Sequence, residues 1–135
     1  MPPLARESYP RPVAGQNLAV AAEALYLTNL LLVPGLAFLI LLVLYIRKIN
    51  DAPPLAACHL RQTLSASLWA GVILVLVNLL IIAMGGYTSS WTWMIVIIYF
   101  TVCHASLVLL GTIGLASAMA GKNYRFPFVG RPCDE

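Results

Sequence analysis

Long uninterrupted apolar runs alternate with short polar segments along this chain of 135 residues. Three runs are long enough to cross a bilayer. Residues 25–46 and 64–84 carry no charged side chain, and in residues 94–119 the only ionisable side chains besides the phenol of Tyr99 are His104 and Cys103. A spanning helix needs about 20 apolar residues, and backbone polar groups must pair within the membrane. The pattern therefore predicts an all-α integral membrane bundle with three transmembrane helices.

The first apolar run is interrupted by Pro34 and Gly35. Proline removes one helix hydrogen bond, yet membrane spans tolerate proline kinks. A single helix kinked at Pro34–Gly35 is therefore the expected form. The alternative is a re-entrant hairpin, which would return the N-terminus to the side of the first connection.

Polar segments flank this membrane domain, which we place at residues 18–121. Residues 1–17 are a polar N-terminal arm without the features of a cleavable signal peptide. Its first 14 or so residues are expected to be extended or loosely ordered. Residues 15–24 are expected to form a short interfacial helix, with Glu23 at the outer interface, where its charge costs little. Residues 122–135 form a basic-aromatic tail.

An amphipathic interfacial segment leads into the second span. Asp51 is the expected helix N-cap, and Pro53 and Pro54 suit a first helical turn. Small residues then recur at four-residue spacing here and near the end of the third span, a pattern that lets membrane helices approach closely. The second and third spans are therefore expected to pack tightly through these pairs: Ala66 and Ala70, Ser67 and Gly71, Gly114 and Ala118, Ser117 and Gly121.

Composition and charge support a membrane protein. Hydrophobic residues make up 61% of the chain and charged residues 10%, too apolar a balance for the core of so short a soluble domain. The net charge of +3 is too small to indicate nucleic-acid binding. Arg47 and Lys48 follow the first span and further basic residues lie in the tail, whereas residues 85–90 carry none. Because cytoplasmic segments are enriched in Lys and Arg, we expect a bacterial inner (cytoplasmic) membrane protein with a cytoplasmic C-terminus and an external N-terminus.

Three cysteines and two histidines are the side chains that could bind a metal ion or a haem. Cys58, Cys103 and Cys133 show no CxxC spacing, so neither a disulfide framework nor a metal site is predicted. His59 and His104 are the only histidines and the only candidate haem ligands, but they are expected at different membrane depths. His104 is instead expected to hydrogen-bond a neighbouring helix, through Asn29 or Asn78.

The end of the third span suggests an interfacial anchor or a docking surface. Gly121 is the expected left-handed residue that ends the helix. Lys122 and Arg125 suit the negative end of the helix dipole and anionic headgroups, while Pro127 prevents helical continuation. Tyr124, Phe126 and Phe128 supply aromatic bulk at headgroup depth. His59 or Gln62 is expected to lie close to the 122–127 turn and to donate to its unpaired carbonyls.

These motifs resemble one family. The elements are "PG" in the first span, "YIRK" at its exit, "HLRQTL" opening the second span and "AMAGKNYRFPFVGR" closing the third. Together they are similar to a small bacterial inner-membrane family of unknown function, which is related to the protein-import channel subunit of the chloroplast inner envelope. Ser65 and Ala66 replace the Asn and aromatic residue that family members often carry. The resemblance implies a helical membrane protein without enzymatic activity.

No nucleophile–base pair, phosphate-binding loop or cofactor motif is present in the sequence. We therefore expect a non-catalytic accessory or scaffold subunit without a cofactor, in contact with the lipid bilayer and other membrane subunits, or a homo-oligomer. A component of a transport or protein-translocation system is the first alternative. A haem-binding electron-transfer protein is the second.

Overall fold

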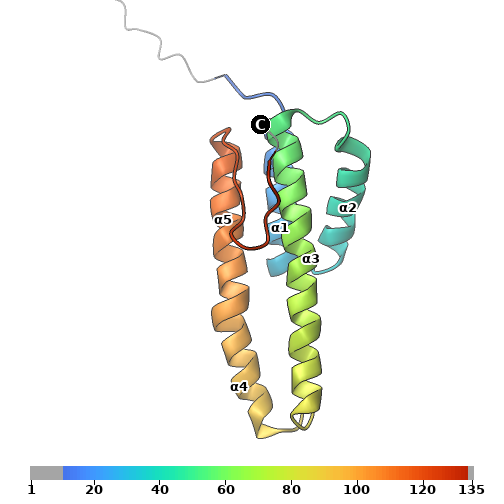
Figure 1. Ribbon diagram of the computed structural model, residues 1–135, viewed down its shortest axis with the longest axis vertical. Coiled ribbons are helices and arrows are strands. Elements are labelled where there is room, and N and C mark those ends of the chain that lie inside the picture. Colours follow the sequence, from blue (N-terminus) through green and yellow to red (C-terminus); the bar gives the residue numbers. More distant parts are fainter. Residues whose placement is uncertain (1–10, 134–135) are drawn as a thin grey trace, which may run out of the picture.

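The computed structural model describes residues 11–133, which form an all-α bundle (Figure 1). Three helices are continuous: α1 (Gln16–Leu31), α2 (Leu36–Lys48) and α3 (Pro54–Ala83). The fourth runs through α4 (Ser90–Ile98), the π-helix η1 (Tyr99–His104) and α5 (Ala105–Met119). Both α3 and the α4–η1–α5 helix have 30 residues and are long and apolar enough to cross a membrane. Most of the predicted N-terminal arm lies outside the described residues.

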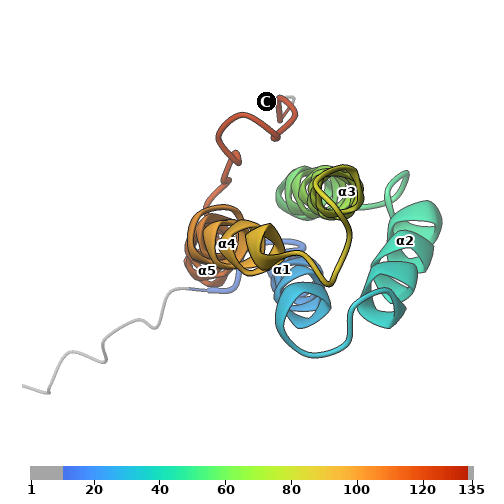
Figure 2. The same cartoon turned by 90° about the horizontal axis from the view of Figure 1, so that it is seen from below.

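The first apolar run is not the single kinked helix that we expected. It forms two helices, α1 of 16 residues and α2 of 13, which lie side by side and run in opposite directions (Figures 1 and 2). At about 1.5 Å per residue, neither reaches across a core about 30 Å thick. The structure thus has two helices of spanning length where the sequence predicted three.

The residues between α1 and α2 explain this reversal. Gly35 has a φ of +85°, which side chains other than glycine rarely adopt, and Pro34 has no N–H to continue the helix. The side chain of Asn29 accepts a hydrogen bond from the Gly35 N–H at 2.9 Å. The break is therefore a capped turn, as in the hairpin alternative.

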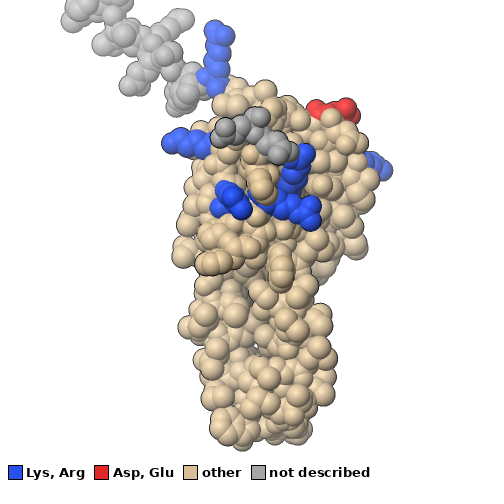
Figure 3. Space-filling model, viewed as in Figure 1, with Lys and Arg blue, Asp and Glu red and all other residues tan. Residues whose placement is uncertain are grey.

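The hairpin brings the start of α1 to the end of α5. The side chain of Gln16 donates to the Met119 carbonyl at 2.6 Å, and a Cβ at Gly121 would lie 2.7 Å from Val13. The prediction that the N-terminal part and the tail lie at opposite ends of the bundle is therefore wrong. We call this shared end the basic end. Basic residues such as Arg61, Lys122 and Arg125 flank residues 62–121, and those residues themselves contain no charged side chain. Figure 3 shows Lys and Arg gathered there on the face in view.

The bundle is uneven along its length. At the basic end, α1, α2, α3 and α5 pack together, and Ala19 of α1 lies in one buried cluster with Leu55 of α3 and Ala118 of α5. Towards the other end only the second half of α3 and α4 continue (Figures 1 and 2). We call residues 72–83 of α3 together with α4 the distal pair. Most large apolar side chains of the distal pair are exposed.

Two capping predictions can be compared with the structure, one at the start of α3 and one at the C-terminal end of α5. The N-cap of α3 is Pro53, with Pro54 at N1, and not Asp51, which lies in the preceding turn. Proline suits N1 because its φ is already helical and its missing N–H would be unpaired there. Gly121 does end α5 as predicted: its φ is +67°, and the Lys122 N–H bonds the Ser117 carbonyl at 2.9 Å.

Two glycines of α5 pack against α1. A Cβ at Gly114 would lie 2.6 Å from Glu23 Oε2, and one at Gly111 would lie 2.5 Å from the Tyr26 ring. On α3, a Cβ at Gly71 would meet nothing within 4 Å. The predicted close approach of Gly71 to the small face of the third span is therefore absent, and at Gly114 it is α1 that occupies the space against α5.

Candidate functional site

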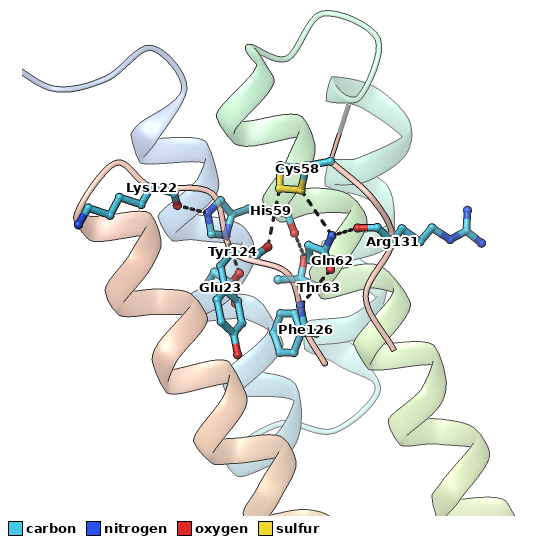
Figure 4. The surroundings of a disulfide bond; sticks show 10 residues. Glu23, Cys58, His59, Gln62, Thr63, Lys122, Tyr124, Phe126 and Arg131 are labelled. Carbon is cyan, nitrogen blue, oxygen red and sulfur yellow. Dashed lines mark hydrogen bonds and ion pairs between the residues drawn. A yellow bond between two sulfur atoms is a disulfide. The ribbon is translucent and has the colours of Figure 1, made fainter. Parts of the chain in front are cut away.

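A buried charge pair lies at the centre of the basic end. His59 Nδ1 on α3 lies 2.6 Å from Glu23 Oε1 on α1, and both side chains are completely buried (Figure 4). Glu23 was expected at the outer membrane interface, where its charge would cost little, but its side chain is completely buried inside the bundle. It is buried because α1 packs against α5 at Gly114, where the absence of a side chain leaves room for the carboxylate.

The other ring nitrogen of His59 holds the tail. His59 Nε2 lies 3.0 Å from the carbonyl oxygen of Lys122, the first residue after the α5 cap. A carbonyl only accepts, so Nε2 carries a proton. The second proton is held between Nδ1 and the Glu23 carboxylate, giving a charge-assisted hydrogen bond. Glu23 Oε2 has no hydrogen-bond partner among the described residues.

Gln62 and Ser65 bind the tail one and two turns further along α3. The Gln62 side-chain oxygen accepts from the Phe126 N–H at 3.3 Å, and its amide nitrogen donates to the Arg131 carbonyl. The Ser65 hydroxyl donates to the Val129 carbonyl at 2.7 Å. The tail runs back along α3 (Figure 4), and the predicted contact of His59 and Gln62 with it is present.

A disulfide joins Cys58 of α3 to Cys133 of the tail, with Cα atoms 5.1 Å apart (Figure 4). The sequence prediction of no disulfide is therefore wrong. Its half-cystines are 75 residues apart, and only the folding of the tail brings them together. Basic residues favour the cytoplasmic side, whereas persistent disulfides are typical of oxidising compartments and of some hyperthermophile interiors. The disulfide and the basic residues thus favour different locations for this end.

Aromatic residues of the tail divide between core and surface. Phe126 is 1% exposed and packs edge-on against Tyr26 and Tyr124, with ring centroids 5.3 and 5.1 Å apart. It is therefore part of the core and not an interfacial anchor. Phe128 is fully exposed. Burial, and secondarily the negative charge of Glu23, raise the pKa of the Tyr124 phenol above its ordinary value.

The remaining predicted tail residues lie on the surface. The side chains of Lys122, Arg125 and Pro127 are exposed, although the backbone of Lys122 is bound by His59. They can therefore meet headgroups or another protein, whereas His59 and Gln62 are completely buried and act within the chain.

His104 lies in η1, away from this cluster. It has no hydrogen-bond partner in the described part of the chain, and its ring packs beside Phe100 with centroids 5.2 Å apart. The predicted bonds to Asn29 and Asn78 are wrong: the Asn29 oxygen caps Gly35, and Asn78 bonds the Leu74 carbonyl and the Tyr87 hydroxyl. A haem held by both histidines would require His59 to give up Glu23 or Lys122.

The cluster of His59, Glu23 and Gln62 can fasten the tail to α1 and α3. Its polar groups bind backbone carbonyls and N–H groups or each other. Residues 11–133 contain no group of three or more His, Cys, Asp or Glu side chains able to hold a metal ion. Sequence reasoning missed Glu23, Cys58, Cys133 and Ser65.

Comparison with known proteins identifies no relative. No protein-family model, no curated protein and no solved structure matches the chain. The resemblance to the small inner-membrane family stays a prediction.

Proposed function

We propose that this chain is a non-catalytic membrane protein, an accessory or scaffold subunit that contacts a larger membrane assembly through its distal pair. The uneven bundle carries the proposal. Two helices of spanning length pack with α1 and α2 over one part of their length only. The remainder is apolar and exposed, including Leu76 and Leu79 on α3 and Ile97 on α4.

Residue types at the two ends support a membrane-spanning placement. Within the described residues, the whole stretch 62–121, which contains the distal pair, has no charged side chain. At the other end Tyr87, Trp91 and Trp93 are exposed, and such aromatic side chains are enriched at membrane interfaces. A helix of 30 residues is about 45 Å long, enough to pass through both interfaces.

The locked tail supports a scaffold role. The disulfide and the bonds of His59, Gln62 and Ser65 hold the backbone of the tail against α3. They leave Arg125 and Phe128 exposed on a fixed support. A surface held in one conformation binds a partner with a smaller loss of conformational entropy than a flexible tail would.

Site-specific photocrosslinking in membranes tests the partner contact. A benzophenone amino acid at Leu79 is expected to give one protein adduct of defined mass, with either another subunit or a second copy of this chain. The same group at Ile46, which is exposed on α2 outside the distal pair, is the matched control and should give lipid adducts only. Lipid adducts alone at both positions would exclude a partner on the distal pair.

A further inference from the structure

A cavity of about 400 Å³ lies beneath the turn between α1 and α2. Its walls come from that turn, from the middle of α3 and from η1. They are mostly apolar and aromatic, and the residues that matter here are Asn29, Phe38, Ser67, Gly71, Phe100 and His104. Ligand pockets typically have volumes of about 300–1,000 Å³ and combine apolar walls with a few polar groups.

One wall residue, Ser67, is a buried polar group without a partner. It is 4% exposed, and its hydroxyl has no hydrogen bond within the described residues. Other helical hydroxyl groups of this chain donate to the carbonyl four residues earlier, as in Thr28, Thr63, Thr112 and Ser117. Its oxygen has almost no accessible surface, so a molecule in the cavity can reach this hydroxyl only when the Ser67 side chain rotates. Because a buried unpaired hydroxyl is unfavourable, a bound molecule with an acceptor favours that rotation.

Two further polar groups on the cavity wall have unused donors. His104 has no hydrogen bond in the described region, and its ring lies beside Phe100. The Asn29 oxygen is committed to Gly35, but no bond within residues 11–133 engages its amide nitrogen. His104 also ends the π-helix η1, and π-helical turns within α-helices occur frequently at functional sites.

We propose that this cavity binds a lipid-soluble molecule with a planar ring and carbonyl oxygens, the chemistry of an isoprenoid quinone. The aromatic walls formed by Phe38 and Phe100 suit a flat ring. The donors of Ser67, His104 and Asn29 suit its carbonyl oxygens. A lipid acyl chain would fill the same volume but would leave all three donors unpaired.

Binding of a labelled quinone to the full chain in phosphatidylcholine nanodiscs tests this proposal. The probe is a ubiquinone with a two-unit isoprenoid tail, and the competitor is an alkylbenzene with a tail of the same length. Saturable binding of about one quinone per chain is expected, without competition by the alkylbenzene. Equal competition, or no saturable binding, would overturn the proposal.

Variants test whether the quinone binds in this cavity. Ser67→Ala and His104→Phe should each weaken binding about tenfold, the effect of losing one hydrogen bond. Ser117→Ala is the matched control, because its hydroxyl is satisfied within α5, and should bind as the unmodified chain does. Gly71→Leu should abolish binding by filling the cavity; if it does not fold, Leu74→Trp serves instead. Unchanged binding in the filled variant would place the quinone elsewhere and overturn the proposal.

Discussion

His59 and Glu23, from helices α3 and α1, meet at 2.6 Å in a completely buried pair at the basic end of the bundle. The two residues are 36 positions apart in the sequence. They meet because α1 and α2 form a hairpin at Gly35, which places α1 between α3 and α5 at the basic end. The other ring nitrogen of His59 is hydrogen-bonded to the Lys122 carbonyl in the tail. One side chain thus joins the hairpin, α3 and the C-terminal segment.

Breaking this pair from one side should destabilise the protein strongly. His59→Leu leaves the Glu23 carboxylate buried without its partner, and the loss of one member of such a pair costs about 3–5 kcal/mol. The double variant with Glu23→Gln removes the uncompensated charge and should recover part of the loss. Thermal unfolding of the purified protein in mild detergent measures both. A double variant less stable than His59→Leu would contradict the charge-pair explanation.

Reduction of the disulfide should release the end of the tail. Loss of a disulfide typically costs about 2–4 kcal/mol, and dithiothreitol should lower the melting temperature accordingly. Alkylation of the denatured, non-reduced protein should modify one cysteine, Cys103, which is free. The variant Cys103→Ser is the control and should keep the full response to reductant. Three cysteines modified without reductant would show that the disulfide is absent from the protein.

Topology reporters can distinguish the hairpin from a spanning first helix. Fusions at the N-terminus, at Asn50 and at Glu135 should all report the same side of the membrane. A fusion at Thr88, in the connection between α3 and α4, should report the opposite side. The basic residues predict that the shared side is the cytoplasm. An N-terminal fusion that agrees with Thr88 would restore the three-span arrangement and contradict the hairpin.

The sequence was informative where the cause of structure is local. Apolar runs predicted the helical class and the two long helices, and the glycine at 121 predicted how α5 ends. The bond from His59 to the Lys122 carbonyl was also predicted, because the end of a helix needs donors for its free carbonyls. Gln62 lies close to the same turn, but there it accepts from the Phe126 N–H.

The failures arise from contacts between distant segments. A proline–glycine pair is compatible with both a kink and a reversal, and the Asn29 cap at Gly35 favours the second. From the sequence alone, Glu23 is typical of a charge at the membrane interface. Its burial depends on the packing of α1 beside His59 of α3. The disulfide depends on a tail that folds back over α3, which no spacing of cysteines indicates.

Two glycines provide a matched test of helix packing. Gly114→Ala would place a Cβ 2.6 Å from Glu23 Oε2, so either α1 or the carboxylate must move. Overpacking of this kind costs about 1–3 kcal/mol, and here it also disturbs the pair with His59. Gly71→Ala adds the same methyl group to a helix with nothing within 4 Å and should be neutral or slightly stabilising, since alanine favours helix. Melting temperatures of the two variants in the same detergent provide the comparison. Equal effects would show that α1 does not pack closely against α5 at Gly114.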